Sequence, residues 1–229
     1  MNDLLNQLEL VGDWLTSSQQ WHGDEGIPQR LQEHLTYSGI SLLFATLIGL
    51  TFGLLVGHTG RGAFAVASVA NLARAIPTFG LVVLVVTLAG LSTTPVLVAL
   101  VALAVPPILI NTFEGVRGVD ADTRDAARGV GMTEWEVLVR VEVPMALPLI
   151  LLGLRVAAIQ VVATATIAAY PGLGGLGRFI VDGLARNDYE LVIGGSTVVV
   201  VLALLVQALF TALRRVIVSP GLQGPAAKS

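Results

Sequence analysis

The chain has 229 residues, of which 54% are hydrophobic and only 13% are charged. Ordinary soluble domains carry about 25% charged residues, so this chain cannot cover a globule of its size with polar surface, and we expect a bilayer to cover it. The absence of cysteine excludes disulfides and thiolate metal sites, and a net charge of −3 gives no indication of nucleic-acid binding.

Residues 1–34 are predicted to form an acidic tail. Six acidic residues precede position 34, and Arg30 is the one basic residue among them. A secretory signal would need a basic start followed by an apolar run, so we do not predict one. Part of the tail has an apolar stripe, which fits a helix lying on the membrane surface as well as a solvated tail. The stripe consists of Leu4, Leu5, Leu8, Leu10 and Trp14.

Five apolar segments follow, each near the roughly 20 residues that cross a bilayer as a helix. They are residues 35–57, 63–90, 95–113, 147–170 and 191–213. Pro77 is expected to break the second segment, and a sixth, split crossing near Arg74 would change the count. The glycines Gly49, Gly53 and Gly57 share one face and would let another helix approach closely, although glycine is common in membrane helices generally.

The distribution of basic residues orients these spans. With the N-terminus outside, the cytoplasmic side collects Arg61, Arg117, Arg124, Arg128, Arg140, Arg214, Arg215 and Lys228. The outer side then keeps Arg30, Arg178 and Arg186. Because cytoplasmic loops of membrane proteins carry an excess of basic residues, we expect the charged segment 114–142 and the tail 217–229 in the cytoplasm and residues 1–34 outside.

The cytoplasmic segment begins with a predicted short helix over residues 120–128. Asp120 and Arg124 are spaced to form an i,i+4 pair, and Gly129 or Gly131 supplies the left-handed residue that ends the helix. Small side chains at positions 126 and 127 present a surface that a partner protein could approach closely. A plain solvated loop is the alternative interpretation.

A second helix is predicted to begin at Thr133. Glu136, three residues later, completes a capping box and also pairs with Arg140. Pro144 and Pro148 are expected to stop the helix before the next span. Its apolar stripe would consist of Trp135, Leu138 and Val141.

This hairpin carries a recognisable pattern. Asp125-Ala126-Ala127, followed by Gly131, Val141 and Val143-Pro144, resembles the Glu-Ala-Ala, Gly, Ile-x-Leu-Pro motif of ATP-binding-cassette (ABC) importer permeases. The sequence differs from that motif in having Asp in place of Glu, and Val in place of both Ile and Leu. The runs 74–78, 128–132 and 170–177 are similar to permeases for osmoprotectants, meaning glycine betaine, choline, carnitine or proline. The resemblance covers about residues 35–216, and Pro171 departs from it.

The resemblance implies an all-α integral membrane protein with the type I ABC importer permease fold, whose coupling loop spans residues 114–148. It implies a dimer of ATP-binding subunits, a second permease subunit that is identical or related, and an extracytoplasmic substrate-binding protein. ATP hydrolysis would belong to the partner, so no catalytic, cofactor or metal site is expected. The implied coupling residues are Asp125, Ala126, Ala127, Gly129, Gly131, Met132, Val141, Val143 and Pro144.

A glycine-rich stretch at 172–177 satisfies the G-x-G-x-x-G dinucleotide pattern. We reject that function because the pattern is meaningful only between a strand and a helix of a soluble βαβ unit. A flexible or re-entrant turn near the external gate is the preferred interpretation, with a simple connecting loop as the alternative. Its glycines are Gly172, Gly174, Gly175 and Gly177.

Two other functions stay open from the sequence: a permease for methionine or another amino acid, and a non-transporting scaffold that recruits a cytosolic partner. Arg155, about two turns into its span, is expected to extend to the cytoplasmic surface. We therefore predict the membrane subunit of an importer in a prokaryotic plasma membrane, working by alternating access.

Overall fold

A computed structural model describes residues 11–75, 77–170, 172–219 and 221, except the side chains at 71, 73 and 74. The predicted stripe at Leu4–Leu10, the departure at Pro171 and Lys228 in the tail lie outside the described residues. The chain divides into two compact units. The first unit comprises Met1–Ser41, Pro77–Val101 and Ile159–Leu205, and the second comprises Leu42–Ile76, Ala102–Ala158 and Val206–Ser229.

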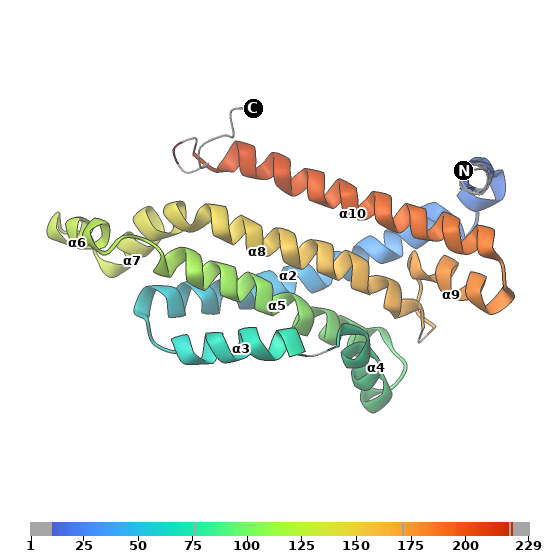
Figure 1. Ribbon diagram of the computed structural model, residues 1–229, viewed down its shortest axis with the longest axis horizontal. Helices are drawn as coiled ribbons and strands as arrows, with labels where there is room; N and C mark the ends of the chain where they lie inside the picture. The colour runs from blue at the N-terminus through green and yellow to red at the C-terminus, as the bar shows by residue number, and fades with distance from the viewer. Residues whose placement is uncertain (1–10, 76, 171, 220, 222–229) are drawn as a thin grey trace. The chain divides into compact units, whose positions relative to one another are not determined.

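Four helical segments are long and apolar enough to cross a membrane (Figure 1). They are α2 (Ile27–Thr59), α5 (Thr93–Arg117), the continuous stretch Glu134–Ala169 that contains α8 (Val143–Thr164), and α10 (Tyr189–Ile217). Each contains one of the predicted apolar segments or overlaps nearly all of it. The described residues form helices and turns without a strand, so the prediction of an all-α membrane protein is confirmed.

The remaining predicted span, 63–90, is broken into two shorter helices. α3 covers Ala63–Ala75 and α4 covers Thr78–Ala89, with Pro77 as the N-cap residue of α4. Pro77 has φ −66° and ψ 120°, an extended conformation that a proline favours and that a helix interior does not allow. Neither helix alone has the roughly 20 residues needed to cross a bilayer. The predicted break at Pro77 is confirmed.

The second unit is held together by close contacts between glycines and neighbouring helices. Three glycines of α2 face α5, and they are Gly49, Gly53 and Gly57. A Cβ added at any of them would come within 2.8 Å of a side-chain Cβ on α5, belonging to Ile108, Thr112 or Val116. No real side chain packs that closely, so the predicted close approach of another helix at these glycines is confirmed.

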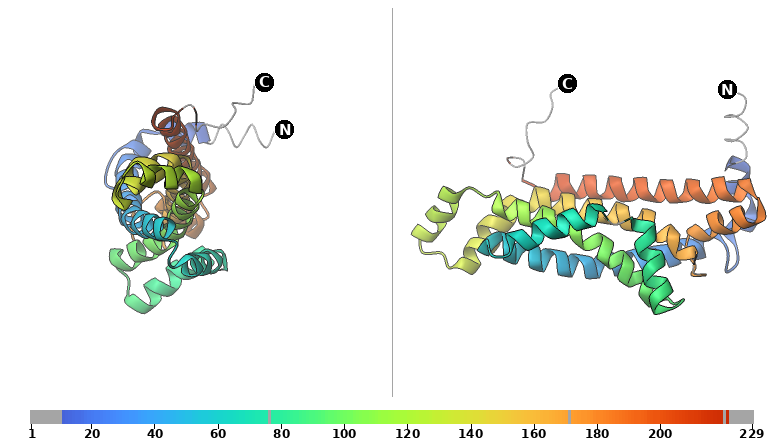
Figure 2. Two further views of the ribbon diagram at one scale, coloured as in Figure 1. Left: turned by 90° about the vertical axis from the view of Figure 1, so that its left-hand side faces the viewer. Right: turned by 60° about the horizontal axis from the view of Figure 1, so that its bottom comes forward.

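α8 packs on α5 in the same way. A Cβ at Gly153 of α8 would lie 2.8 Å from the Cβ of Asn111, and one at Gly115 of α5 would lie 3.1 Å from the Cβ of Ala146. Within the second unit, α2, α5 and α8 therefore form a tightly packed group with α3 alongside, and Figure 2 shows the second unit from two further sides.

In the first unit, the segment before α2 packs on α9 (Gly177–Arg186) and on the start of α10. Trp14 is buried and meets the ring of Phe179 edge-on, with centroids 5.4 Å apart and an angle of 85° between the planes. Side chains at Gly194 or Gly195 of α10 would collide with these two rings. This part of the predicted tail is thus packed on helices of the first unit.

Candidate functional site

The predicted hairpin consists of α6 (Ala121–Gly129) and α7 (Glu134–Val137), and it extends beyond the adjoining ends of α5 and α8 (Figure 1). Asp120 is the N-cap of α6, where its carboxylate accepts a hydrogen bond from the Thr123 N–H at 3.1 Å. The predicted pair between Asp120 and Arg124 is wrong, because capping already uses the aspartate. Arg124 points to a different carboxylate, described below.

The turn between the two helices uses Gly131. This residue has φ +89°, whereas Gly129 is the last residue of α6. The Met132 N–H donates to the carbonyl of Ala127 at 3.2 Å, and the Gly131 N–H donates to that of Arg128 at 2.9 Å. This pair of hydrogen bonds is the Schellman arrangement, which fixes the bend of the hairpin. Of the two glycines left open by the sequence, the structure selects Gly131.

The capping box that begins the second helix is confirmed. The Glu136 N–H donates to the Thr133 hydroxyl at 3.3 Å, and the Thr133 N–H donates to the Glu136 carboxylate at 3.0 Å. Glu136 also pairs with Arg140 at 3.4 Å, as predicted. Both ends of the turn are thus fixed by local hydrogen bonds.

The predicted stop at Pro144 and Pro148 is wrong. The helix from the hairpin continues through a π-helical turn, Leu138–Glu142, directly into α8. In that turn the Val143 N–H donates to the carbonyl of Leu138, so the hydrogen-bond register widens just before Pro144, which has no N–H to donate. α7 is therefore continuous, through this turn, with a helix long enough to cross a membrane.

A buried carboxylate lies where this helical element meets the end of α2. The Glu142 side chain is completely buried, and its Oε2 accepts a hydrogen bond from Nδ1 of His58 at 2.6 Å. The other ring nitrogen of His58 lies 3.4 Å from Oε2 of Glu134 in α7. His58 thus links the last turn of α2 to the first residue of α7 and to the last residue of the π-helical turn.

Arg124 connects α6 to the same carboxylate. One of its guanidinium nitrogens lies 3.7 Å from Oε1 of Glu142. The other donates to the carbonyls of Arg117 at 3.0 Å and Val119 at 2.7 Å, at and just beyond the C-terminal end of α5. A cation at that end of a helix satisfies carbonyls that have no partner within the helix. We call Glu142, His58 and Arg124 the anchor cluster.

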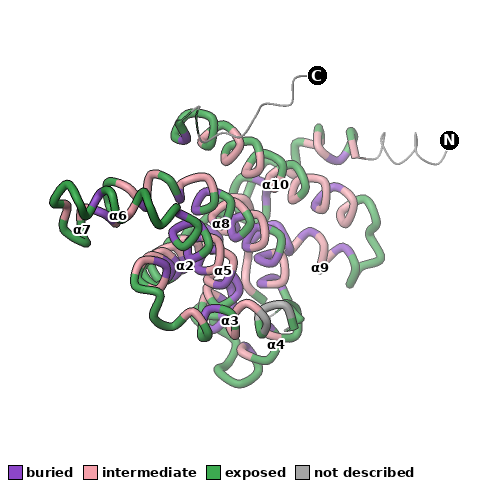
Figure 3. Tube along the Cα trace, turned by 60° about the vertical axis from the view of Figure 1, so that its left-hand side comes forward, coloured by how far each residue is buried: buried purple, intermediate pink, exposed green. Residues whose placement is uncertain are grey.

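The outer surface of the hairpin is partly apolar, and it differs from the predicted surface. Ala127 is buried and Ala126 is exposed, so only one of the two alanines can meet a partner. Trp135, expected on the packed stripe, is 71% exposed, and Val137 is buried in its place. Figure 3 shows the hairpin of α6 and α7 as mostly exposed. Val130 is 79% exposed. Large apolar side chains exposed on a charged hairpin are typical of a protein-binding surface.

Asp125 of the motif takes part in a surface ion-pair network. Its carboxylate accepts from Arg128 at 3.0 Å, while Arg128 also donates two hydrogen bonds to Glu134, at 2.9 and 3.1 Å. The two carboxylates raise the pKa of the Arg128 guanidinium. Because all three side chains are well exposed, this network contributes little to stability and serves to orient the turn.

The motif residues Val141, Val143 and Pro144 lie in the continuous helical element behind the hairpin, partly buried. The structure thus gathers all nine predicted coupling residues in α6, the turn and the π-helical junction with α8. Sequence reasoning did not find the anchor cluster. The available signal was a lone glutamate, Glu142, in the otherwise apolar run 141–146.

The glycine-rich loop lies in the first unit, and it is anchored to α2. The Gly175 N–H donates to Oε2 of Glu33 at 2.7 Å, and Arg30 donates to the same oxygen at 3.1 Å. A side chain at Gly174 would collide with Glu33, and one at Gly177 with the carbonyl of Thr166. Gly172 and Gly175 have positive φ, of 82° and 91°. The loop is therefore closely packed, with one carboxylate as its main polar anchor.

Arg155 contacts a neighbouring helix, and its extension to the cytoplasmic surface stays a prediction. Its Nε donates to the amide oxygen of Gln207 at 2.7 Å, a contact between α8 and α10 within the second unit. This hydrogen bond is part-buried and holds the guanidinium against α10. In the part of the chain that the structure describes, no three side chains gather in a way that could hold a metal ion.

Residues 45–220 match the family model described as binding-protein-dependent transport system inner membrane component. The chain belongs to this family. It is therefore a permease subunit of a transport system and a multi-pass membrane protein, as predicted.

Three relatives of this permease have similar lengths. The glycine betaine/carnitine/choline transport system permease of Bacillus subtilis is 34% identical over 84% of this chain and 88% of its own. The carnitine transport permease of Listeria monocytogenes is 37% identical over 76% and 80%, and the osmoprotectant import permease of Salmonella typhimurium is 34% identical over 78% and 76%.

Solved structures share the fold. A chain of the inward-facing MetNI methionine ABC transporter matches with a TM-score of 0.73 and 20% identity, over 84% of this permease and 96% of that chain. An amino acid ABC transporter matches with a TM-score of 0.67 and 18% identity, over 92% and 97%. The fold is that of type I ABC importer permeases, as the sequence predicted.

Proposed function

We propose that this permease is the membrane subunit of an ATP-driven importer for osmoprotectants of the glycine betaine, choline, carnitine and proline class. The support is its similarity to the three relatives above, which are named for such solutes and are 34%, 37% and 34% identical. The likeness to the methionine transporter, at 20% identity, supports the architecture and says nothing of the solute.

In this proposal α6 is the coupling helix, and it docks into a groove of a separate ATP-binding subunit. The single observation that carries the proposal is the anchor cluster. Buried Glu142, in the helical element that becomes α8, contacts His58 at the end of α2 and Arg124 of α6. Arg124 also donates to the end of α5. A displacement of α6 by the ATP-binding subunit would therefore act on three membrane helices together. Exposed Val130 and Trp135 supply apolar area for the docking.

The proposed assembly contains two permease subunits, identical or related, a dimer of ATP-binding subunits and an extracytoplasmic binding protein. Residues 1–34 lie outside, 35–216 form the membrane domain, and 217–229 lie in the cytoplasm. The loop 172–177 forms part of the outer gate, and its hydrogen bond to Glu33 couples it to the start of α2. The excess of arginine on the side of the hairpin supports this orientation.

Reconstitution in proteoliposomes tests the function. The complex is assembled with its ATP-binding subunit and binding protein, and uptake of radiolabelled glycine betaine, choline, carnitine, proline and methionine is measured. We expect ATP-dependent uptake of at least one osmoprotectant. Uptake of methionine alone would show that the permease carries an amino acid and that the proposed osmoprotectant class is wrong. Uptake of none, with ATP hydrolysis indifferent to the binding protein, would overturn the importer.

A matched pair of variants tests the role of α6. Ala126 and Ala121 are both exposed alanines of α6, separated by about 140° around the helix at 3.6 residues per turn. Ala126→Leu adds bulk to the motif surface and should reduce uptake and the amount of ATP-binding subunit that copurifies. Ala121→Leu should leave both unchanged. Equal behaviour of the two variants would show that the motif surface of α6 is not the docking face.

A further inference from the structure

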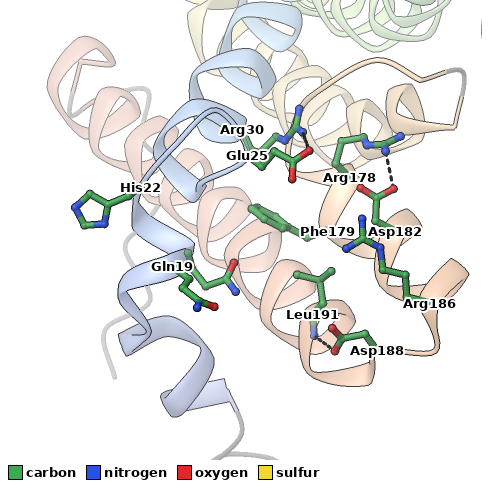
Figure 4. Close-up of a pocket in the computed structure, with 11 residues that line it drawn as sticks. Gln19, His22, Glu25, Arg30, Arg178, Phe179, Asp182, Arg186, Asp188 and Leu191 are labelled. Atoms are coloured by element: carbon green, nitrogen blue, oxygen red, sulfur yellow. Dashed lines mark hydrogen bonds and ion pairs between the residues drawn. The ribbon is translucent and has the colours of Figure 1, made fainter.

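The first unit contains a polar cavity of about 330 Å³ that the transport proposal does not use. It lies between the segment before α2, the polar face of α9 and the start of α10 (Figure 4). Small-molecule sites typically have volumes of about 300–1,000 Å³, so the cavity can hold a compact solute. In the proposed orientation it is on the outer side of the membrane.

Among the residues that the structure describes, one cation on the wall formed by α9 has no partner. Arg178, Asp182 and Arg186 are spaced four residues apart and therefore share a helix face. Arg178 and Asp182 neutralise each other through a contact of 2.6 Å. The Arg186 guanidinium has no hydrogen bond or ion pair with any residue that the structure describes, and Figure 4 shows it pointing along α9 toward Asp182. It can donate to an anionic group in the cavity.

Two carboxylates at the edge of the cavity are only partly neutralised. Asp188 accepts one hydrogen bond, from the Leu191 N–H at 3.1 Å. Glu25 is 87% exposed and lies 3.7 Å from Arg30, whose guanidinium is shared with Glu33 at 3.1 Å. The cavity thus offers a free guanidinium on one wall and carboxylates elsewhere.

We propose that this cavity binds a small zwitterion, with the carboxylate of the solute on Arg186 and its cationic group toward Asp188 and Glu25. A simple anion would be repelled by the two carboxylates, and a simple cation would be repelled by Arg186. A molecule that carries both charges therefore fits best. Phe179 and Trp14 are each 6% exposed, so recognition is electrostatic rather than aromatic. That the zwitterion is a solute of the transported class rests on the proposed function.

Equilibrium binding tests the site. The probe is radiolabelled glycine betaine, applied to the permease with its ATP-binding subunit in nanodiscs, without binding protein. Choline is the control ligand because it has the same quaternary ammonium and no carboxylate. We expect saturable binding of one glycine betaine per permease chain, with choline at least about tenfold weaker, since one charge-assisted hydrogen bond is lost.

Arg186→Gln should weaken glycine betaine binding at least about tenfold and remove its advantage over choline. Arg61 is also exposed and lies in the turn after α2, and Arg61→Gln should bind glycine betaine as the unmodified protein does. Elution of both variants as intact complexes in size-exclusion chromatography checks that they fold. Unchanged binding in Arg186→Gln, or no saturable binding to the unmodified complex, would overturn the site.

Uptake with the binding protein, measured in parallel, separates this proposal from the proposed function. Normal uptake by a complex that binds no glycine betaine on its own would refute the cavity and leave the importer intact. If Arg186→Gln weakened only the association with the binding protein, the cavity would belong to protein docking, and the zwitterion site would be wrong.

Discussion

The contact between α2 and α5 gives a sharp test of the packing. In Gly53→Ala, the new Cβ would lie 2.7 Å from the Cβ of Thr112, 2.9 Å from its Cγ2 and 3.0 Å from the carbonyl oxygen of Leu109. Ordinary contact begins near 3.4 Å, so the first of these distances is about 0.7 Å too short. Two helix backbones must separate to accommodate it, and overpacking of this kind costs about 1–3 kcal/mol.

Alanine also has an intrinsic advantage over glycine in a helix, of about 0.5–1 kcal/mol. Gly39 provides the control, because it lies in the same helix and a Cβ added there meets nothing within 4 Å. Gly39→Ala should therefore be neutral or stabilising by up to about 1 kcal/mol. Gly53→Ala should lower the free energy of unfolding, net of that advantage, by about 1–2 kcal/mol.

The assay is unfolding of the purified protein in mixed micelles by titration with sodium dodecyl sulfate, followed by circular dichroism. The difference between the two variants isolates the steric cost from helix propensity. If Gly53→Ala and Gly39→Ala had the same free energy of unfolding, the glycines would not be in the close contact described. A Gly49→Ala variant, with its Cβ 2.8 Å from Ile108, should repeat the result.

Three further predictions concern the hairpin and use the same unfolding assay. Glu142→Gln removes the buried carboxylate that accepts from His58 and lies 3.7 Å from Arg124, and it should cost about 3–5 kcal/mol. A double variant with His58→Gln should lose less than the sum of the single losses. Strict additivity would show that the two side chains do not interact. Gly131→Ala should cost about 1 kcal/mol or more because of its φ of +89°, whereas Gly129→Ala, in α6, should not destabilise. The opposite order would contradict the Schellman turn. Thr133→Ala should cost about 1 kcal/mol through loss of the cap, and no change would mean that the capping box does not form.

Local features of this permease could be predicted because their causes lie within a few residues. The capping box at Thr133 depends on a side chain three positions away, and the break before α4 depends on one proline. The proline prediction failed at Pro144 because the outcome there depends on a π-helical turn. Such turns are rare and occur mostly as single turns inside α-helices, so a proline by itself does not predict one.

By itself the sequence determined the membrane class, the approximate spans and the bent helical hairpin, since composition, apolar length and capping residues act locally. Only the tertiary structure decided which charges are buried together. His58 and Glu142 are 84 residues apart, and Glu33 and Gly175 are 142 apart. A buried charge is tolerated only where a partner arrives from another helix, and that partner is fixed by how the helices pack rather than by any nearby residue.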